Sequence, residues 1–143
     1  MRMLLSALNA LLGLVLTLTP FWLAPVCSQM APHGGPMKCY YSGLFVVGMG
    51  AVILFFALIA LLRRGRGWLA VLASLVAIAA AVACLLVPAG VIPLRGAGWV
   101  CGLCGDPTHA CRAVTMPLVR KIAAAIVAVN AFSLVWAFVK GSR

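Results

Sequence analysis

The chain has 143 residues, of which 66% are hydrophobic and only 8% are charged. Soluble domains carry roughly 25% charged residues, so this composition excludes both a water-soluble fold and a disordered chain. The eleven Lys and Arg residues are accompanied by a single acid, Asp106, which excludes a mechanism that needs paired carboxylates. The basic residues flank long apolar runs, so they indicate membrane topology, and we expect no nucleic-acid partner.

Four apolar runs are long enough to cross a bilayer as helices. Each exceeds the roughly 17 residues that a helix needs to span the hydrocarbon core at 1.5 Å per residue. The runs are residues 3–23, 44–62, 68–87 and 122–139. We therefore expect an all-α, polytopic membrane protein, with residues 1–143 forming a single bundle of four transmembrane helices surrounded by lipid.

A short arginine-rich turn predicts the orientation of this bundle. Residues 63–67 read Arg-Arg-Gly-Arg-Gly, and dense positive charge in a short turn is typical of the cytoplasmic side. This prediction places both termini in the cytoplasm and the two longer loops, residues 24–43 and 88–121, outside the cell membrane. Positive charge is nearly balanced between the two sides, so the prediction depends on the density of the turn.

Small and amide side chains within the runs predict how the helices meet. Close helix contacts in lipid favour small residues, and amides can hydrogen-bond between helices. Small residues recur at helical steps in the third and fourth runs, at Ala70, Ser74, Ala77, Ala81 and Cys84, and at Ala124, Ala128 and Ala131. Gly48 and Gly50 predict a further close contact. We interpret Asn9 and Asn130 as an interhelical hydrogen-bonding pair rather than a polar path.

The reactive side chains gather in the two longer loops, and the two halves of the chain look alike. Five of the six cysteines lie there: Cys27, Cys39, Cys101, Cys104 and Cys111. Each half reads helix, cysteine loop, helix, and Met37-Lys38-Cys39 aligns with His109-Ala110-Cys111. The bundle is therefore predicted to consist of two helix–Cys loop–helix hairpins with both loops on one side.

Structural disulfides are the first chemistry that these loops predict. In an oxidising compartment nearby cysteines pair. Cys27 with Cys39, and Cys104 with Cys111, would each close one loop. Sequence does not determine connectivity, so pairs between the loops are equally allowed.

Thiol redox work is the second possibility. Cys101-Gly102-Leu103-Cys104 is a Cys-x-x-Cys motif, in which one thiol is often acidified and active in exchange. Four spans with cysteines in two outer loops resemble the layout of the quinone-linked disulfide oxidases of bacterial membranes. Those enzymes keep a Cys-x-x-Cys in the first loop, and this first loop has none.

A soft-metal or haem site is the third possibility. Thiolate, thioether and imidazole ligands suit Cu(I), zinc or haem iron. The candidate ligands are Met37, Cys39, Cys104, His109 and Cys111. Covalent c-type haem is not expected, because Gly105 follows Cys104 where a histidine is required.

The loop motifs resemble a small prokaryotic four-helix membrane family that is catalogued only as a domain of unknown function. The shared pattern is Met-x-Cys at Met37–Cys39 and Cys-x6-Cys-Arg at Cys104–Arg112, with Cys27 matching an earlier loop cysteine. His109 departs from the family, which often has methionine there. The resemblance implies an accessory role beside an ABC-type permease. We therefore expect a non-enzymatic accessory or binding subunit of a membrane transport complex without a cofactor, with the redox and metal interpretations as alternatives.

Overall fold

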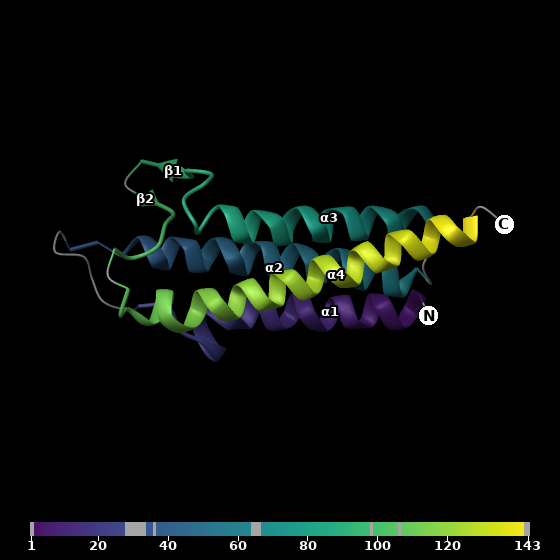
Figure 1. Ribbon diagram of the computed structural model, residues 1–143, viewed down its shortest axis with the longest axis horizontal. Helices are drawn as coiled ribbons and strands as arrows, with labels where there is room; N and C mark the ends of the chain where they lie inside the picture. Colours follow the sequence, from purple (N-terminus) through teal and green to yellow (C-terminus); the bar gives the residue numbers. More distant parts are fainter. Residues whose placement is uncertain are drawn as a thin grey trace.

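The computed structural model describes residues 2–27, 34–35, 37–63, 67–97, 99–105 and 107–141. Four helices in this part of the chain are long and apolar enough to cross a membrane (Figure 1). They are α1 (Arg2–Leu18), α2 (Lys38–Leu62), α3 (Gly67–Leu86) and α4 (Met116–Gly141). The prediction of an all-α, multi-pass bundle of four helices is confirmed.

The helices form a closed ring of neighbours. Helix α1 packs on α2, α2 on α3 and α3 on α4, while α4 closes against α1. Figure 1 shows the start of α1 and the end of α4 at the same end of the bundle, with the interhelical loops that carry the cysteines at the other end. Residues 64–66, the centre of the predicted cytoplasmic turn, lie outside the described residues.

An apolar core lies in the half of the bundle nearer the cysteine loops, and α4 contributes a different face from the one predicted. The core consists of Leu16, Val46, Ile53, Ala77, Ala80, Ala81, Cys84, Val119, Ile122, Ala123 and Ile126. On α3, the predicted small residues Ser74, Ala77, Ala81 and Cys84 are buried, which confirms this part of the stripe. The stripe on α4 is wrong, since Ala124, Ala128 and Ala131 are exposed. Both faces of α4 have helical spacing, so periodicity alone does not select the one that packs.

Helices α1 and α2 approach closely at two glycines. A Cβ on Gly50 would lie 2.6 Å from Thr17 Oγ1, and one on Gly13 would lie 2.9 Å from the backbone nitrogen of Leu54. Any side chain there would force the helices apart. The predicted contact at Gly50 is confirmed, whereas a Cβ on Gly48 would meet no neighbouring atom within 4 Å, so the contact predicted there is wrong.

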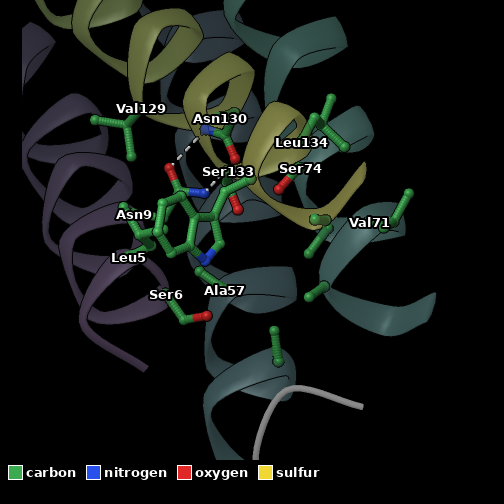
Figure 2. Close-up of a pocket in the computed structure, with 15 residues that line it drawn as sticks. Leu5, Ser6, Asn9, Ala57, Val71, Ser74, Val129, Asn130, Ser133 and Leu134 are labelled. Atoms are coloured by element: carbon green, nitrogen blue, oxygen red, sulfur yellow. Dashed lines mark hydrogen bonds between the residues drawn. The ribbon is translucent and has the colours of Figure 1, made fainter. Parts of the chain in front are cut away.

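The two amides predicted to pair between helices do so (Figure 2). Asn9 Nδ2 donates to Asn130 Oδ1 at 2.6 Å, and Asn130 Nδ2 donates to Asn9 Oδ1 at 2.8 Å. Asn130 Nδ2 also donates to the carbonyl of Ile126 at 2.7 Å. This reciprocal pair joins α1 to α4 across a separation of 121 residues, and it satisfies groups that would be costly to leave unpaired in lipid.

The helical segments begin earlier than the apolar runs. Helix α2 begins at Lys38, and a wide helical turn, η2 (Cys111–Thr115), leads directly into α4. Hydropathy measures transfer into lipid rather than backbone hydrogen bonding, so polar first turns escape it. A second wide turn, η1 (Thr19–Leu23), follows α1 and contains Pro20, which lacks the backbone N–H that a regular turn requires. Cys39 and Cys111 therefore lie on first helical turns.

A short β-hairpin, which was not expected from the sequence, lies in the second loop. Strands β1 (Arg95–Gly96) and β2 (Trp99–Val100) pair antiparallel, and the Cys101 backbone N–H donates to the carbonyl of Leu94 at 3.0 Å. The indole ring of Trp99 lies where a Cβ on Gly96 would be, so only glycine fits there. The hairpin returns the chain to the first turns of α2, and Cys104 follows the hairpin.

Candidate functional site

Four cysteines meet at the end of the bundle that carries the interhelical loops. The Sγ atoms of Cys27, Cys39, Cys104 and Cys111 all lie within 4.8 Å of one another. We call these residues the four-cysteine group, and all four are free thiols in the structure. Each half of the chain supplies two of them, so neither half alone makes the site.

Helix starts position two members of the group and irregular chain positions the other two. Cys39 lies in the first turn of α2, and Cys111 is the first residue of η2. Cys27 follows η1, where Val26 packs 3.3 Å from the position of a Cβ on Gly43 of α2. One contact in the group joins the two loops, since the Sγ atoms of Cys39 and Cys104 are 3.1 Å apart.

The hydroxyl of Ser42 holds the second loop against α2. Its Oγ accepts a hydrogen bond from the backbone N–H of Gly102 at 2.8 Å and donates to the carbonyl of Gly102 at 3.0 Å. Ser42 is one turn from Cys39 on the same helix face, and Gly102 lies just before Cys104. These two hydrogen bonds therefore bring Cys104 over Cys39.

The hydroxyl of Thr115 does the same for the first loop. Its Oγ1 donates to the carbonyl of Ala24 at 2.9 Å. Thr115 follows Cys111 by one turn, and Ala24 lies just before Cys27, so the bond brings Cys27 to Cys111. Sequence reasoning missed both hydroxyls. The available signal was a Ser or Thr three or four residues after each helix-start cysteine, which places the two side chains on one face.

The group lies on an apolar floor and is partly shielded from solvent. Cys39 and Cys111 are buried, whereas Cys27 and Cys104 are half-buried. A small space of about 10 Å³ lies directly beneath, lined mainly by apolar side chains that include Pro20, Val26, Val46, Leu103 and Val119. This environment disfavours isolated charge and strengthens any interaction between charged ligands.

The two half-buried thiols differ in their tendency to ionise. Burial raises the pKa of Cys104 to about 11, and its hydrogen bond with Cys39 acts in the same direction. Burial also acts to raise the pKa of Cys27, but hydrogen bonds from the backbone and side chain of Cys111 help to outweigh it, and the pKa is lowered. The hydrogen bonds from Cys111 thus favour the charged form of Cys27, whereas burial favours the protonated form of Cys104.

Positive side chains flank the group. The Cδ of Lys38 lies 3.9 Å from the position of a Cβ on Gly102, so this side chain passes over the second loop. Arg112 Nη1 donates to the carbonyl of Gly105 at 3.5 Å. The one acidic residue of the sequence, Asp106, lies outside the described residues. Among the described residues, the charged side chains around the thiols are therefore cationic.

The other predicted site residues lie elsewhere. Cys101 is outside the four-cysteine group, and burial raises its pKa. It lines an open groove of about 330 Å³, together with Tyr41, Leu44, Phe45, Leu94 and Trp99. His109 is also outside the group, and its buried Nδ1 has no hydrogen-bond partner in the described chain. Met37 is half-buried immediately before α2.

The arrangement allows two kinds of chemistry. Four convergent thiols offer a ligand set for one metal ion, and they also allow two disulfides between the loops. Residues 101–104 are not helical, and Cys101 lies outside the group that contains Cys104. The groove beside Cys101 therefore has one thiol of that motif and not both.

Comparison with known proteins identifies the family. No curated protein and no solved structure matches the chain. A family model described as "Domain of unknown function (DUF4418)" matches residues 9–136, which include all four cysteines of the group and most of each membrane-spanning helix. Since the match covers most of the chain, the protein belongs to this family of unknown function.

Proposed function

We propose that this multi-pass membrane protein binds one thiophilic metal ion, with Zn²⁺ the best fit, through Cys27, Cys39, Cys104 and Cys111. The observation that carries the proposal is the convergence of four sulfur atoms within 4.8 Å of one another. Four cysteines drawn from two distant parts of the chain form a closed ligand set, which is typical of zinc sites.

The distances favour a single ion. Zinc–sulfur bonds of about 2.3 Å in a tetrahedron separate the sulfur atoms by about 3.8 Å. The separations in the group include the 3.1 Å between Cys39 and Cys104 and reach at most 4.8 Å, so they bracket that value. An iron–sulfur cluster places several irons and sulfides between its thiolates and needs wider spacing. Small side-chain adjustments would complete a mononuclear site.

The surrounding charges support the same ligand set. Four thiolates around a divalent ion carry a net charge of −2, which an apolar floor alone would disfavour. Lys38 and Arg112 lie beside the group. Cys39 and Cys111 also begin helical segments, where the N-terminal dipole favours negative charge.

Disulfides remain the competing interpretation, and the geometry favours a different pairing from closure within each loop. Cys39 and Cys104 are in contact at 3.1 Å, and Cys27 interacts with Cys111, so the favoured bridges join the two loops. Bridging depends on the compartment: loops outside the cell would be oxidised, and loops in a reducing cytoplasm would keep thiols available for metal. The outward orientation of the two loops is still a prediction, and it determines whether the site forms disulfides or keeps thiols for metal.

The redox and accessory-subunit interpretations have fewer observations in their support. A redox role for Cys101 and Cys104 is supported by the groove beside Cys101, but Cys104 is engaged with Cys39. The accessory role beside an ABC-type permease rests on the family resemblance.

One experiment on purified protein tests the proposal. Metal content is measured by mass spectrometry of the elements, and the thiol state of every cysteine is mapped in the same preparation by alkylation before and after reduction. We expect one metal ion per chain, and we expect the four thiols of the group to become accessible to alkylation once a chelator removes the metal. Cys104→Ser should abolish stoichiometric metal, while the matched control Cys84→Ser, in the apolar core of α3, should retain it. Mapped disulfides Cys39–Cys104 and Cys27–Cys111 without metal would overturn the proposal.

A further inference from the structure

A second cavity lies in the opposite half of the bundle, and it collects polar side chains of the spans. All four helices line it, through residues 5–9 of α1, 57–60 of α2, 70–74 of α3 and 129–137 of α4. The polar lining residues are Ser6, Asn9, Ser74, Asn130 and Ser133. The apolar core occupies later residues of α1 and α3 and earlier residues of α2 and α4, so the cavity lies toward the end where the termini lie.

The polar lining residues come from α1, α3 and α4. In Figure 2, Ser74 and Ser133 lie near the amide pair, with Ser6 further along. Ser74 is only 5% exposed and lines the space. Asn9 Nδ2 gives one of its two hydrogens to Asn130, which leaves the other free among the described residues. Unpaired polar groups at membrane depth cost several kcal/mol each, so another donor or acceptor is required.

We propose that this cavity is an aqueous vestibule that opens on the side of the termini and binds water at Ser74 and the Asn9–Asn130 pair. The space is about 30 Å³, and each buried water needs roughly 10–15 Å³ of such space, so the cavity holds about two water molecules. A stable buried water needs two to four polar partners, and the hydroxyls and amides here supply them.

The vestibule ends at the core. Leu16, Ile53 and Ile126 are at most 1% exposed and occupy the next layer of the bundle toward the four-cysteine group. Water therefore enters from one side and stops, and the ligand class of the site is water and similarly small, uncharged hydrogen-bonding molecules. Among the described residues, the lining offers no ionisable side chain to attract a free ion.

Thiol labelling in lipid nanodiscs tests the vestibule, because lipid covers the sides of the bundle and leaves both ends open. We would introduce Ser74→Cys and, separately, Ser133→Cys, and follow their oxidation by hydroxyl radicals, which are generated from water and are as small as water, by peptide-resolved mass spectrometry. The native Cys84 is fully buried on the same helix as Ser74 and serves as the internal standard in every variant. Leu75→Cys, at a lipid-facing position that is 55% exposed, is the matched neighbour.

We expect the cysteines at 74 and 133 to be oxidised at least about ten times faster than Cys84, since the radicals form from water that contacts the thiol. Leu75→Cys should stay slow in lipid. Reaction at 74 and 133 no faster than at Cys84 would overturn the proposal. Equal rates at 74 and 75 would also overturn it, because the label would then report a loosened helix. Rapid labelling of Cys84 identifies an unfolded variant, in which case the other serine variant decides.

Discussion

The reciprocal amide bond between α1 and α4 allows a quantitative test of how the bundle is held together. Asn9 and Asn130 exchange two hydrogen bonds of 2.6 and 2.8 Å, and both residues are buried. Interhelical hydrogen bonds in membranes average about 0.6 kcal/mol in double-mutant cycles. Two such bonds predict a coupling free energy of about 1.2 kcal/mol.

Each single substitution should cost more than this coupling suggests. Asn9→Ala or Asn130→Ala leaves the other amide buried without its partner, which costs about 1–3 kcal/mol of unfolding free energy. The double variant removes both amides, so no orphan remains and its cost should fall below the sum of the single costs by about 1.2 kcal/mol.

Equilibrium unfolding in mixed micelles with rising SDS content, followed by circular dichroism, measures all four members of the cycle. Asn9→Ala combined with Gly48→Ala is the control, because a Cβ on Gly48 has no neighbour within 4 Å and the two costs should add. If the losses of unfolding free energy in the two single variants add up to the loss in the double variant within about 0.3 kcal/mol, the amide pair does not couple the helices.

Three further predictions follow from the same contacts. Ser42→Ala removes the two hydrogen bonds that dock the second loop, which are worth about 1–3 kcal/mol. The affinity for zinc, measured by competition with a chelator, should fall by up to about 5- to 150-fold, while Ser133→Ala should leave it unchanged. Gly50→Ala should destabilise the bundle by about 1–3 kcal/mol in SDS unfolding because its Cβ would meet Thr17, whereas Gly48→Ala should be neutral or slightly stabilising; equal effects would contradict the packing. The pKa of Cys104 is about 11, so zinc must displace its proton, and affinity should rise at least about tenfold per pH unit between about pH 6 and 8. A pH-independent affinity, measured by competition, would contradict this ligand.

The membrane architecture could be predicted from the sequence because its cause is local. Runs of apolar residues longer than the bilayer must form helices there, since lipid offers no partner for the backbone. The pairing of Asn9 with Asn130 followed from the same rule, because lone amides in lipid need each other. Which face of α4 packs could not be predicted: Ala124, Ala128 and Ala131 share helical spacing with the buried face but point outward.

The four-cysteine group could be predicted only in composition. Its members were recognisable as loop thiols, but their convergence depends on Ser42 and Thr115, which fix backbone segments distant in sequence. The Cys101–Cys104 motif did not indicate that Cys104 joins Cys39 instead. A Cys-x-x-Cys spacing brings two thiols together when the segment is helical, and here it follows strand β2 instead.

The position of the group explains why all four helices are needed for a site built from four side chains. Cys39 and Cys111 begin the helical segments of α2 and α4, while Cys27 and Cys104 arrive on the chain that follows η1 and β2. Each hydroxyl bond joins one half of the chain to the other, so the site is complete only when the two halves are docked. A ligand that binds only the docked state stabilises it by mass action. Metal at this end and the amide pair at the other would therefore clamp the same helix assembly from its two ends.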